Sequence, residues 1–89
     1  MTASPSRTFR QRVLNVVRQI PAGKTMTYQE VALEAGSPGA ARAVGNIMKG
    51  NFDPSVPCHR VVRSDGQLGD YNRGGTRAKR DLLQAENAL

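Results

Sequence analysis

Apolar side chains recur at helical spacing near the start of the chain and again near its end. In the first stretch they lie three or four positions apart, at Phe9, Val13, Val16, Val17 and Ile20, which is the period of one helix face. Ser4-Pro5 is a plausible start for this helix, and Pro21 with Gly23 ends it. The last stretch predicts a helix from about Thr76 to Ala88, whose apolar face carries Ala78, Leu82, Ala85 and Leu89.

Two shorter helices are predicted between these. Thr27-Tyr28-Gln29-Glu30 is a capping box, in which Thr27 caps the helix and Glu30 reaches back to it. That helix runs to about Ala35, where Gly36 supplies a left-handed stop. Ser37-Pro38 starts the next helix almost at once, and Gly50 closes it. Two short helices joined by a glycine turn are typical of a helix-turn-helix, although many helical domains contain such a pair without touching DNA.

The helix that ends at Gly50 has two distinct faces. At about 100° per residue, the core face is formed by Ala40, Val44, Ile47 and Met48. The opposite face is basic, polar and partly bare, with Arg42, Gly45, Asn46 and Lys49 and with Ala41 beside them. Small residues next to an arginine allow the helix backbone to come close to a narrow partner. The alternative for Arg42 is a solvated surface arginine, which is the commoner fate of that residue type.

The pattern changes after Gly50. Residues 51–55 are expected to form a loop, and 70–75 another. Between them, Val61-Val62-Arg63, a turn at Ser64-Asp65-Gly66, and Gln67-Leu68-Gly69 predict a tiny hairpin. The expected fold is therefore a small, mostly helical α+β domain, a winged helix-turn-helix with a short hairpin as its wing, spanning residues 1–89 as one domain.

Charge narrows the range of partners. The chain holds 13 Lys and Arg against 7 Asp and Glu, a net charge of +6, and no acidic residue precedes Glu30. Such asymmetry favours a polyanionic partner, nucleic acid first and an anionic membrane second, against a merely basic soluble domain. No apolar run is long enough to span a bilayer, and no signal peptide is visible. One Cys and one His are too few for a metal cluster, so we expect neither a metal nor another cofactor.

The chain's only cysteine and only histidine are adjacent, in Val56-Pro57-Cys58-His59-Arg60-Val61. A lone cysteine is most often a small buried hydrophobe, and a lone histidine is more often structural than catalytic. The chemical alternative is a thiol nucleophile, since a nearby base or cationic cluster raises the thiolate fraction. Arg60 and Arg63 would add positive potential, and Glu86 could orient His59 as the third member of a relay.

The motif Pro57-Cys58-His59-Arg60-Val61 resembles the active site of O6-alkylguanine-DNA alkyltransferases, the methylated-DNA–protein-cysteine methyltransferases. Further segments resemble the family's catalytic domain in the same order: Thr27 to Ala32, Ala41 to Gly45, Lys49-Gly50-Asn51, Gly69-Asp70-Tyr71 and Leu82-Leu83. The resemblance covers about residues 8–87. It implies DNA repair by stoichiometric transfer of an alkyl group from O6-alkylguanine to a cysteine, after the base has flipped out of duplex DNA.

The resemblance also implies roles for individual residues. Cys58 would accept the alkyl group, His59 would act as a base through water, and Glu86 would orient His59. Tyr28 would assist base flipping and form a hydrogen bond with the guanine, and Asn51 would support the active-site turn. The helix bearing Ala41 and Gly45 would enter the minor groove, where Arg42 fills the gap left by the base.

The remaining implied positions concern the base pocket. The backbone of Val61 would help to read the guanine, and Tyr71 would lie on the loop that closes over it. The stretch Asn72-Arg73-Gly74-Gly75 is one residue longer than the family's usual loop. Either the amide of Asn72 or that of Arg73 would then meet the guanine oxygen.

Members of this family usually carry a separate N-terminal domain, which we expect to be absent here. Two other functions stay open. An alkyltransferase-like damage sensor binds the same lesion and recruits other repair proteins, but typically has tryptophan in place of the thiol. A plain helix-turn-helix regulator is the second. We expect a cytoplasmic monomer (nuclear in a eukaryote) that binds double-stranded DNA and no membrane.

Overall fold

The computed structural model describes residues 8–69 and 71–89, and its first helix, α1 (Phe9–Arg18), begins immediately after Thr8. The Thr8 hydroxyl accepts from the backbone N–H of Gln11 at 3.1 Å, and the Gln11 side chain accepts from the N–H of Thr8 at 3.0 Å. This reciprocal cap satisfies two donors that the helix leaves free. The predicted start at Ser4-Pro5 lies outside the described residues. The Thr8 cap was not predicted from the sequence.

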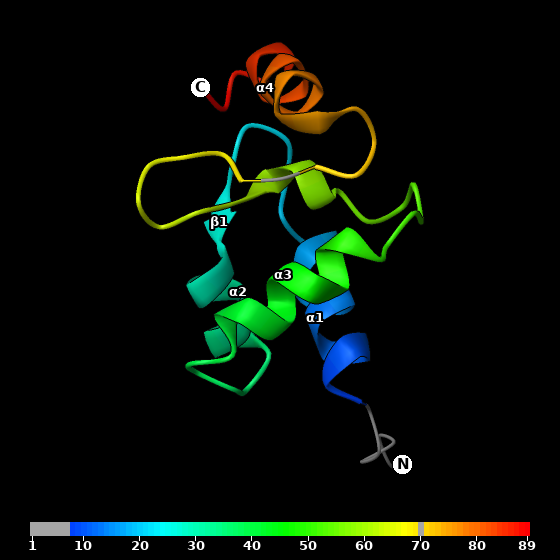
Figure 1. Ribbon diagram of the computed structural model, residues 1–89, viewed down its shortest axis with the longest axis vertical. Coiled ribbons are helices and arrows are strands. Elements are labelled where there is room, and N and C mark those ends of the chain that lie inside the picture. The colour runs from blue at the N-terminus through cyan, green and yellow to red at the C-terminus, as the bar shows by residue number, and fades with distance from the viewer. Residues whose placement is uncertain (1–7, 70) are drawn as a thin grey trace.

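Helices α2 (Tyr28–Glu34) and α3 (Ala41–Lys49) form the predicted helix pair (Figure 1). The capping box is confirmed, because Thr27 and Glu30 exchange bonds of 2.8 and 3.0 Å. Gly36 has the expected left-handed φ of 88°. The predicted start of α3 at Ser37 is wrong. Gly39 also has a positive φ, 96°, so residues 37–40 form a turn before the helix begins.

The predicted hairpin is only partly right. Strand β2 (Val61–Val62) pairs in parallel with β1 (Met26–Thr27), with Met26 opposite Val61 and Thr27 opposite Val62. A turn does follow Arg63, whose N–H donates to the Gln67 carbonyl at 3.0 Å. Residues 67–69 nevertheless form no strand. Val61 is fully buried, so β2 is fixed by the core rather than by the turn.

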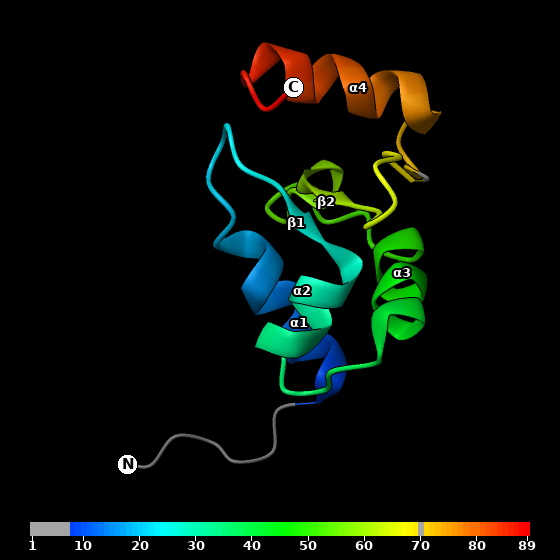
Figure 2. The ribbon, with the colours of Figure 1, turned by 90° about the vertical axis from the view of Figure 1, so that its left-hand side faces the viewer.

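The core joins α1, α2, α3 and the segment around residue 58. Its buried members are Val13, Val17, Ile20, Val31, Ala32, Ala35, Val44, Met48, Val56, Cys58 and Val61. Figure 2 shows α4 (Gly75–Ala85) across one end of the molecule, with β1 and β2 between it and the other three helices. No helix in the described part of the chain is long and apolar enough to cross a membrane.

The predicted inner face of α4 is wrong. Lys79 and Leu83 are the fully buried residues, whereas Leu82 is 39% exposed and Leu89 62% exposed. The helix packs mainly on the short 3₁₀ helix η1 (Cys58–Arg60), whose surface toward α4 is polar. Lys79 lies over the Tyr28 ring, and Glu86 at the end of the helix pairs with His59 and Arg60 of η1. Apolar periodicity does not detect such contacts.

Candidate active site

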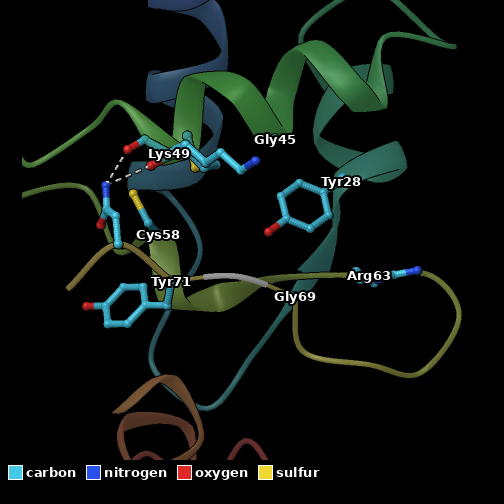
Figure 3. Close-up of a pocket in the computed structure, with 9 residues that line it drawn as sticks. Tyr28, Gly45, Lys49, Cys58, Arg63, Gly69 and Tyr71 are labelled. Carbon is cyan, nitrogen blue, oxygen red and sulfur yellow. Dashed lines mark hydrogen bonds between the residues drawn. The ribbon is translucent and has the colours of Figure 1, made fainter. Parts of the chain in front are cut away.

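A pocket of about 170 Å³ lies where α3, η1 and the segment that precedes α4 meet (Figure 3). Tyr28 lies across this space from Cys58, with Gly45 of α3 on one side and Gly69 and Tyr71 on the other. Its lining is mixed, combining a thiol, two phenols, an amide and two cations: Tyr28, Gly45, Met48, Lys49, Cys58, Arg63, Gly69, Tyr71 and Asn72. A concave pocket with a few convergent polar groups is the usual form of a small-ligand site.

Cys58 is a free cysteine at the first residue of η1 and is 4% exposed. The side-chain amide of Asn51 donates to its Sγ at 3.0 Å, and Asn51 is itself buried, at 3% exposed. This hydrogen bond holds the sulfur in a fixed position relative to Asn51. The thiol therefore combines access to a pocket with a hydrogen-bond donor that positions its sulfur.

Beside the thiol, three side chains form one ionic cluster. His59 Nε2 lies 2.9 Å from Glu86 Oε2, and Arg60 donates to both oxygens of Glu86, at 3.0 and 2.6 Å. Arg60 also donates to the Ile20 carbonyl at 2.8 Å. The guanidinium of Arg60 first, and His59 to a smaller extent, together lower the pKa of Glu86 to about 2 against the opposing effect of burial.

Glu86 is placed by the end of α4. Asn87 has a left-handed φ of 61°. The N–H groups of Asn87 and Ala88 donate to the carbonyls of Gln84 and Leu83 at 3.0 and 2.8 Å. This is the Schellman arrangement that terminates helices, and it leaves Glu86 at the C-cap, facing η1. The predicted pairing of His59 with Glu86 is present, and Arg60 completes it.

Both arginines that were expected to add positive potential at the thiol pair with carboxylates. Arg60 is bound to the Glu86 carboxylate, and Arg63 pairs with Asp65 at 2.6 Å. Each cation is balanced by a carboxylate nearer to it. Within the described residues no hydrogen bond joins His59 to Cys58, so a proton passing between them needs an intermediary such as water.

Lys79 is the residue that sequence reasoning missed. It is fully buried, and its Nζ lies 5.7 Å from the centre of the Tyr28 ring, within the range of a cation–π contact. Gly69 lines the pocket near Tyr28 and has a φ of 84°, and a Cβ there would come 3.1 Å from the Tyr28 hydroxyl. A lysine in a basic helix carries no signal of burial in the sequence.

A second hollow, of about 480 Å³, runs along the exposed face of α3. It shares Tyr28, Gly45, Lys49 and Arg63 with the pocket and adds Ala41 and Arg42. A Cβ on Gly45 would meet nothing within 4 Å, so the fold itself does not require glycine there. The bare face predicted from sequence is therefore open to an external partner.

The structure thus brings Tyr28, Gly45, Cys58, Tyr71 and Asn72 to one pocket and places Ala41 and Arg42 on the adjoining hollow. Asn51 contacts the Cys58 sulfur, and His59, the next residue along the chain, pairs with Glu86. Of the four residues predicted for the base pocket, two do not line it. Val61 is buried in the core, and the Arg73 side chain donates to the Asp53 carbonyl at 2.8 Å. No group of three or more His, Cys, Asp and Glu among the described residues could hold a metal ion.

Known proteins match the chain over nearly its whole length. The family described as 6-O-methylguanine DNA methyltransferase, DNA binding domain, matches residues 8–88. A methylated-DNA–protein-cysteine methyltransferase of Methanothermobacter thermautotrophicus is 48% identical over 88% of this chain and 43% of its own length. That of Mus musculus is 47% identical over 86% of this chain and 37% of its own. The chain therefore spans less than half the length of these relatives.

Solved structures agree with the sequence matches. Mycobacterium tuberculosis OGT in complex with DNA superposes with a TM-score of 0.84 and 44% identity, over 93% of this chain and 51% of that one. S. pombe Atl1, in complex with damaged DNA containing O6-carboxymethylguanine, gives 0.78 and 36% identity over 90% of this chain and 78% of that one. The fold expected from sequence is confirmed by both.

Proposed function

Because this chain belongs to the 6-O-methylguanine DNA methyltransferase family, we propose that it repairs DNA by moving an alkyl group from O6-alkylguanine onto Cys58. The observation that carries the proposal is the free Cys58 thiol in a pocket that opens onto the hollow along α3. A nucleophile there would face a base swung out of a duplex lying against α3. The pocket would hold the base, and the hollow would hold the DNA.

The transfer is an in-line displacement. The Cys58 sulfur attacks the alkyl carbon, the bond from that carbon to O6 breaks, and its electron pair stays with the guanine. The thiol proton passes through water to His59, and the departing guanine takes up one proton. Asn51 positions the sulfur by donating to Sγ, and Glu86 orients His59. The thioether product is stable, so each molecule reacts once.

Docking of α3 in the minor groove of double-stranded DNA is part of the proposal. That groove is only about 6 Å wide, and Gly45 with Ala41 keeps this face of the helix narrow. Arg42 lies exposed on the same face and would fill the space that the flipped base vacates. Tyr28, between the hollow and the pocket, would assist flipping. Tyr71, the Val61 backbone, and the amide of Asn72 or Arg73 would then contact the guanine.

A second function, sensing the lesion without repair, is favoured by one observation. The fold superposes on S. pombe Atl1, solved in complex with damaged DNA, with a TM-score of 0.78 and 36% identity. Such a protein would act as a monomer on lesion-bearing DNA and would hand the site to other repair proteins. The thiol in the pocket supports transfer over sensing alone.

Intact-protein mass spectrometry separates these functions. Incubation with a duplex that contains one O6-methylguanine should add one methyl group to Cys58, and a second equivalent should add nothing. Cys58→Ser should bind the same duplex about as tightly and gain no mass, because its hydroxyl is a far poorer nucleophile. Lesion-selective binding without any mass change in the parent would establish the sensor instead, and indifference to the lesion would refute both.

A further inference from the structure

The side-chain amide of Asn72 lies against three backbone carbonyl oxygens. Its nitrogen is 2.7 Å from the oxygen of Lys49, 2.8 Å from that of Asn51 and 3.2 Å from that of Met48. Carbonyl oxygens only accept hydrogen bonds, so the group facing them is the amino end of the amide. Two hydrogens serve three acceptors: the two short contacts are direct bonds, and Met48 receives a weaker shared one.

These acceptors belong to two different parts of the site. Met48 and Lys49 form the last turn of α3, where helix carbonyls have no partner within the helix. Asn51 is the residue whose side chain donates to the Cys58 sulfur. A single amide thus ends the helix that faces the hollow and holds the backbone of the residue that contacts the thiol.

Asn72 is itself part of the pocket wall. Its neighbour Arg73 reinforces the attachment by donating to the Asp53 carbonyl at 2.8 Å and more weakly to that of Asn51 at 3.4 Å. The other end of the Asn72 amide, Oδ1, is buried without a hydrogen-bond partner among the described residues. Buried polar atoms are rarely left unpaired. In the opposite orientation Oδ1 would face three carbonyl oxygens, which cannot donate to it. The three carbonyls therefore set the orientation of the amide.

We propose that Asn72 is a positioning residue for alkyl transfer, which fixes Asn51 against the Cys58 sulfur and ties the pocket wall to the end of α3. The inference rests on the proposed function. It assigns Asn72 a role through its side chain, separate from any contact that its backbone makes with the guanine. Without the amide, the Asn51 donor and the wall at Tyr71 lose their common anchor, and thiol and substrate carbon are no longer held in line.

The test compares Asn72→Ala with Asn15→Ala. The Asn15 side chain accepts a hydrogen bond from Arg18 at 3.2 Å within one turn of α1. Asn15→Ala is therefore the matched control, because it removes an asparagine side chain and its hydrogen bond at a position away from the site. The rate of Cys58 methylation is measured at saturating O6-methylguanine duplex, beside the Kd for undamaged duplex. Asn72→Ala should slow the saturated rate by between about 10- and 100-fold, the scale of a small misplacement. Its Kd should stay within about twofold of the parent's, since phosphate contacts supply most of the affinity.

A merely structural role would give a different pattern. It would weaken DNA binding and lower the melting temperature while leaving the saturated rate at the parent's value, and that result overturns the proposal. Asn72→Asp keeps the shape of the side chain and replaces the amino group by an acceptor. Its rate of Cys58 methylation at saturating duplex should therefore fall at least as far as that of Asn72→Ala. A parent-like saturated rate in Asn72→Asp, or an equal loss in Asn15→Ala, also overturns the proposal.

Reaction of Cys58 with iodoacetamide separates failure of this inference from failure of the proposed function. If the parent never acquires a methyl group, alkyl transfer is refuted and the iodoacetamide rate becomes the measure of thiol positioning. A rate lower in Asn72→Ala than in the parent and in Asn15→Ala then supports the anchor. Equal rates in all three overturn it.

Discussion

Replacing Glu86 by glutamine should flatten the dependence of stability on acid pH. In the folded chain the pKa of Glu86 is lowered from 4.5 to about 2, chiefly by Arg60. A lowered pKa stabilises the fold above the unfolded value and loses that contribution as pH falls toward the folded value. At about 1.36 kcal/mol per pKa unit the full effect is at most about 3 kcal/mol.

Most of that loss falls in an accessible interval. Between pH 6 and pH 3 the unfolded carboxyl takes up its proton while the folded one stays ionised, which removes up to about 2 kcal/mol. The side chain is 17% exposed, and solvent screening lowers this figure somewhat. Glu86→Gln has nothing to titrate there, so its free energy of unfolding should fall by about 2 kcal/mol less than the parent's over this interval.

Urea unfolding at pH 6 and pH 3 measures this difference. The chain contains no tryptophan, so far-ultraviolet circular dichroism of the four helices is the suitable signal. Asp65→Asn is the matched control, because it removes a carboxylate from the exposed Arg63–Asp65 pair, which is worth roughly 0–1 kcal/mol. Parallel losses in the parent and Glu86→Gln would mean that the cluster of His59, Arg60 and Glu86 is not formed in solution.

Four further outcomes are expected. Arg42→Ala should slow repair of duplex DNA at least about tenfold more than reaction with free O6-alkylguanine, because flipping costs a few kcal/mol; equal slowing would exclude this role. His59→Gln should lower the methylation rate of Cys58 near pH 7 by about 100-fold or more, and an unaltered pH–rate profile would remove His59 from the mechanism. Gly45→Leu should fold normally, since a Cβ there meets nothing within 4 Å. Its duplex DNA affinity, measured by filter binding or anisotropy, should nevertheless be at least about tenfold weaker, which corresponds to about 1.4 kcal/mol of steric cost. Parent-like affinity would mean that the DNA does not lie against α3. Affinity for undamaged duplex should fall linearly with the logarithm of salt concentration, and a flat response would contradict phosphate-dominated binding.

Several features of the fold follow from residues close together in the chain. The capping box at Thr27 and Glu30 and the left-handed stop at Gly36 are bonds and backbone angles within one helical turn, and both are present. The core face of α3 was predictable for the same reason, since Val44 and Met48 are buried four residues apart. Such helix start and stop signals depend only on residues within the segment itself, so the sequence is sufficient to predict them.

Pairings between distant segments were not predictable in this way. Short strands carry little preference for one partner, so β2 could be expected to pair across the nearby turn, yet it pairs with β1 about 35 positions earlier. The inner face of α4 depends on what the helix packs against. Lys79 is buried with its Nζ over the Tyr28 ring and Leu83 is buried beside it, whereas Leu82 remains partly exposed.

The sequence by itself determined the chemistry available to this protein: one thiol, one adjacent imidazole, and a helix face kept bare at Ala41 and Gly45. The motif around Cys58 also indicated the family. Only the tertiary structure decided how that chemistry is arranged. In the folded chain the Asn51 amide donates to the Cys58 sulfur, Arg60 pairs with Glu86, and the Asn72 amide donates to the Asn51 carbonyl. The physical reason is that hydrogen bonds and ion pairs between side chains act over about 3 Å, and chain folding alone brings residues 7 to 26 positions apart within that distance.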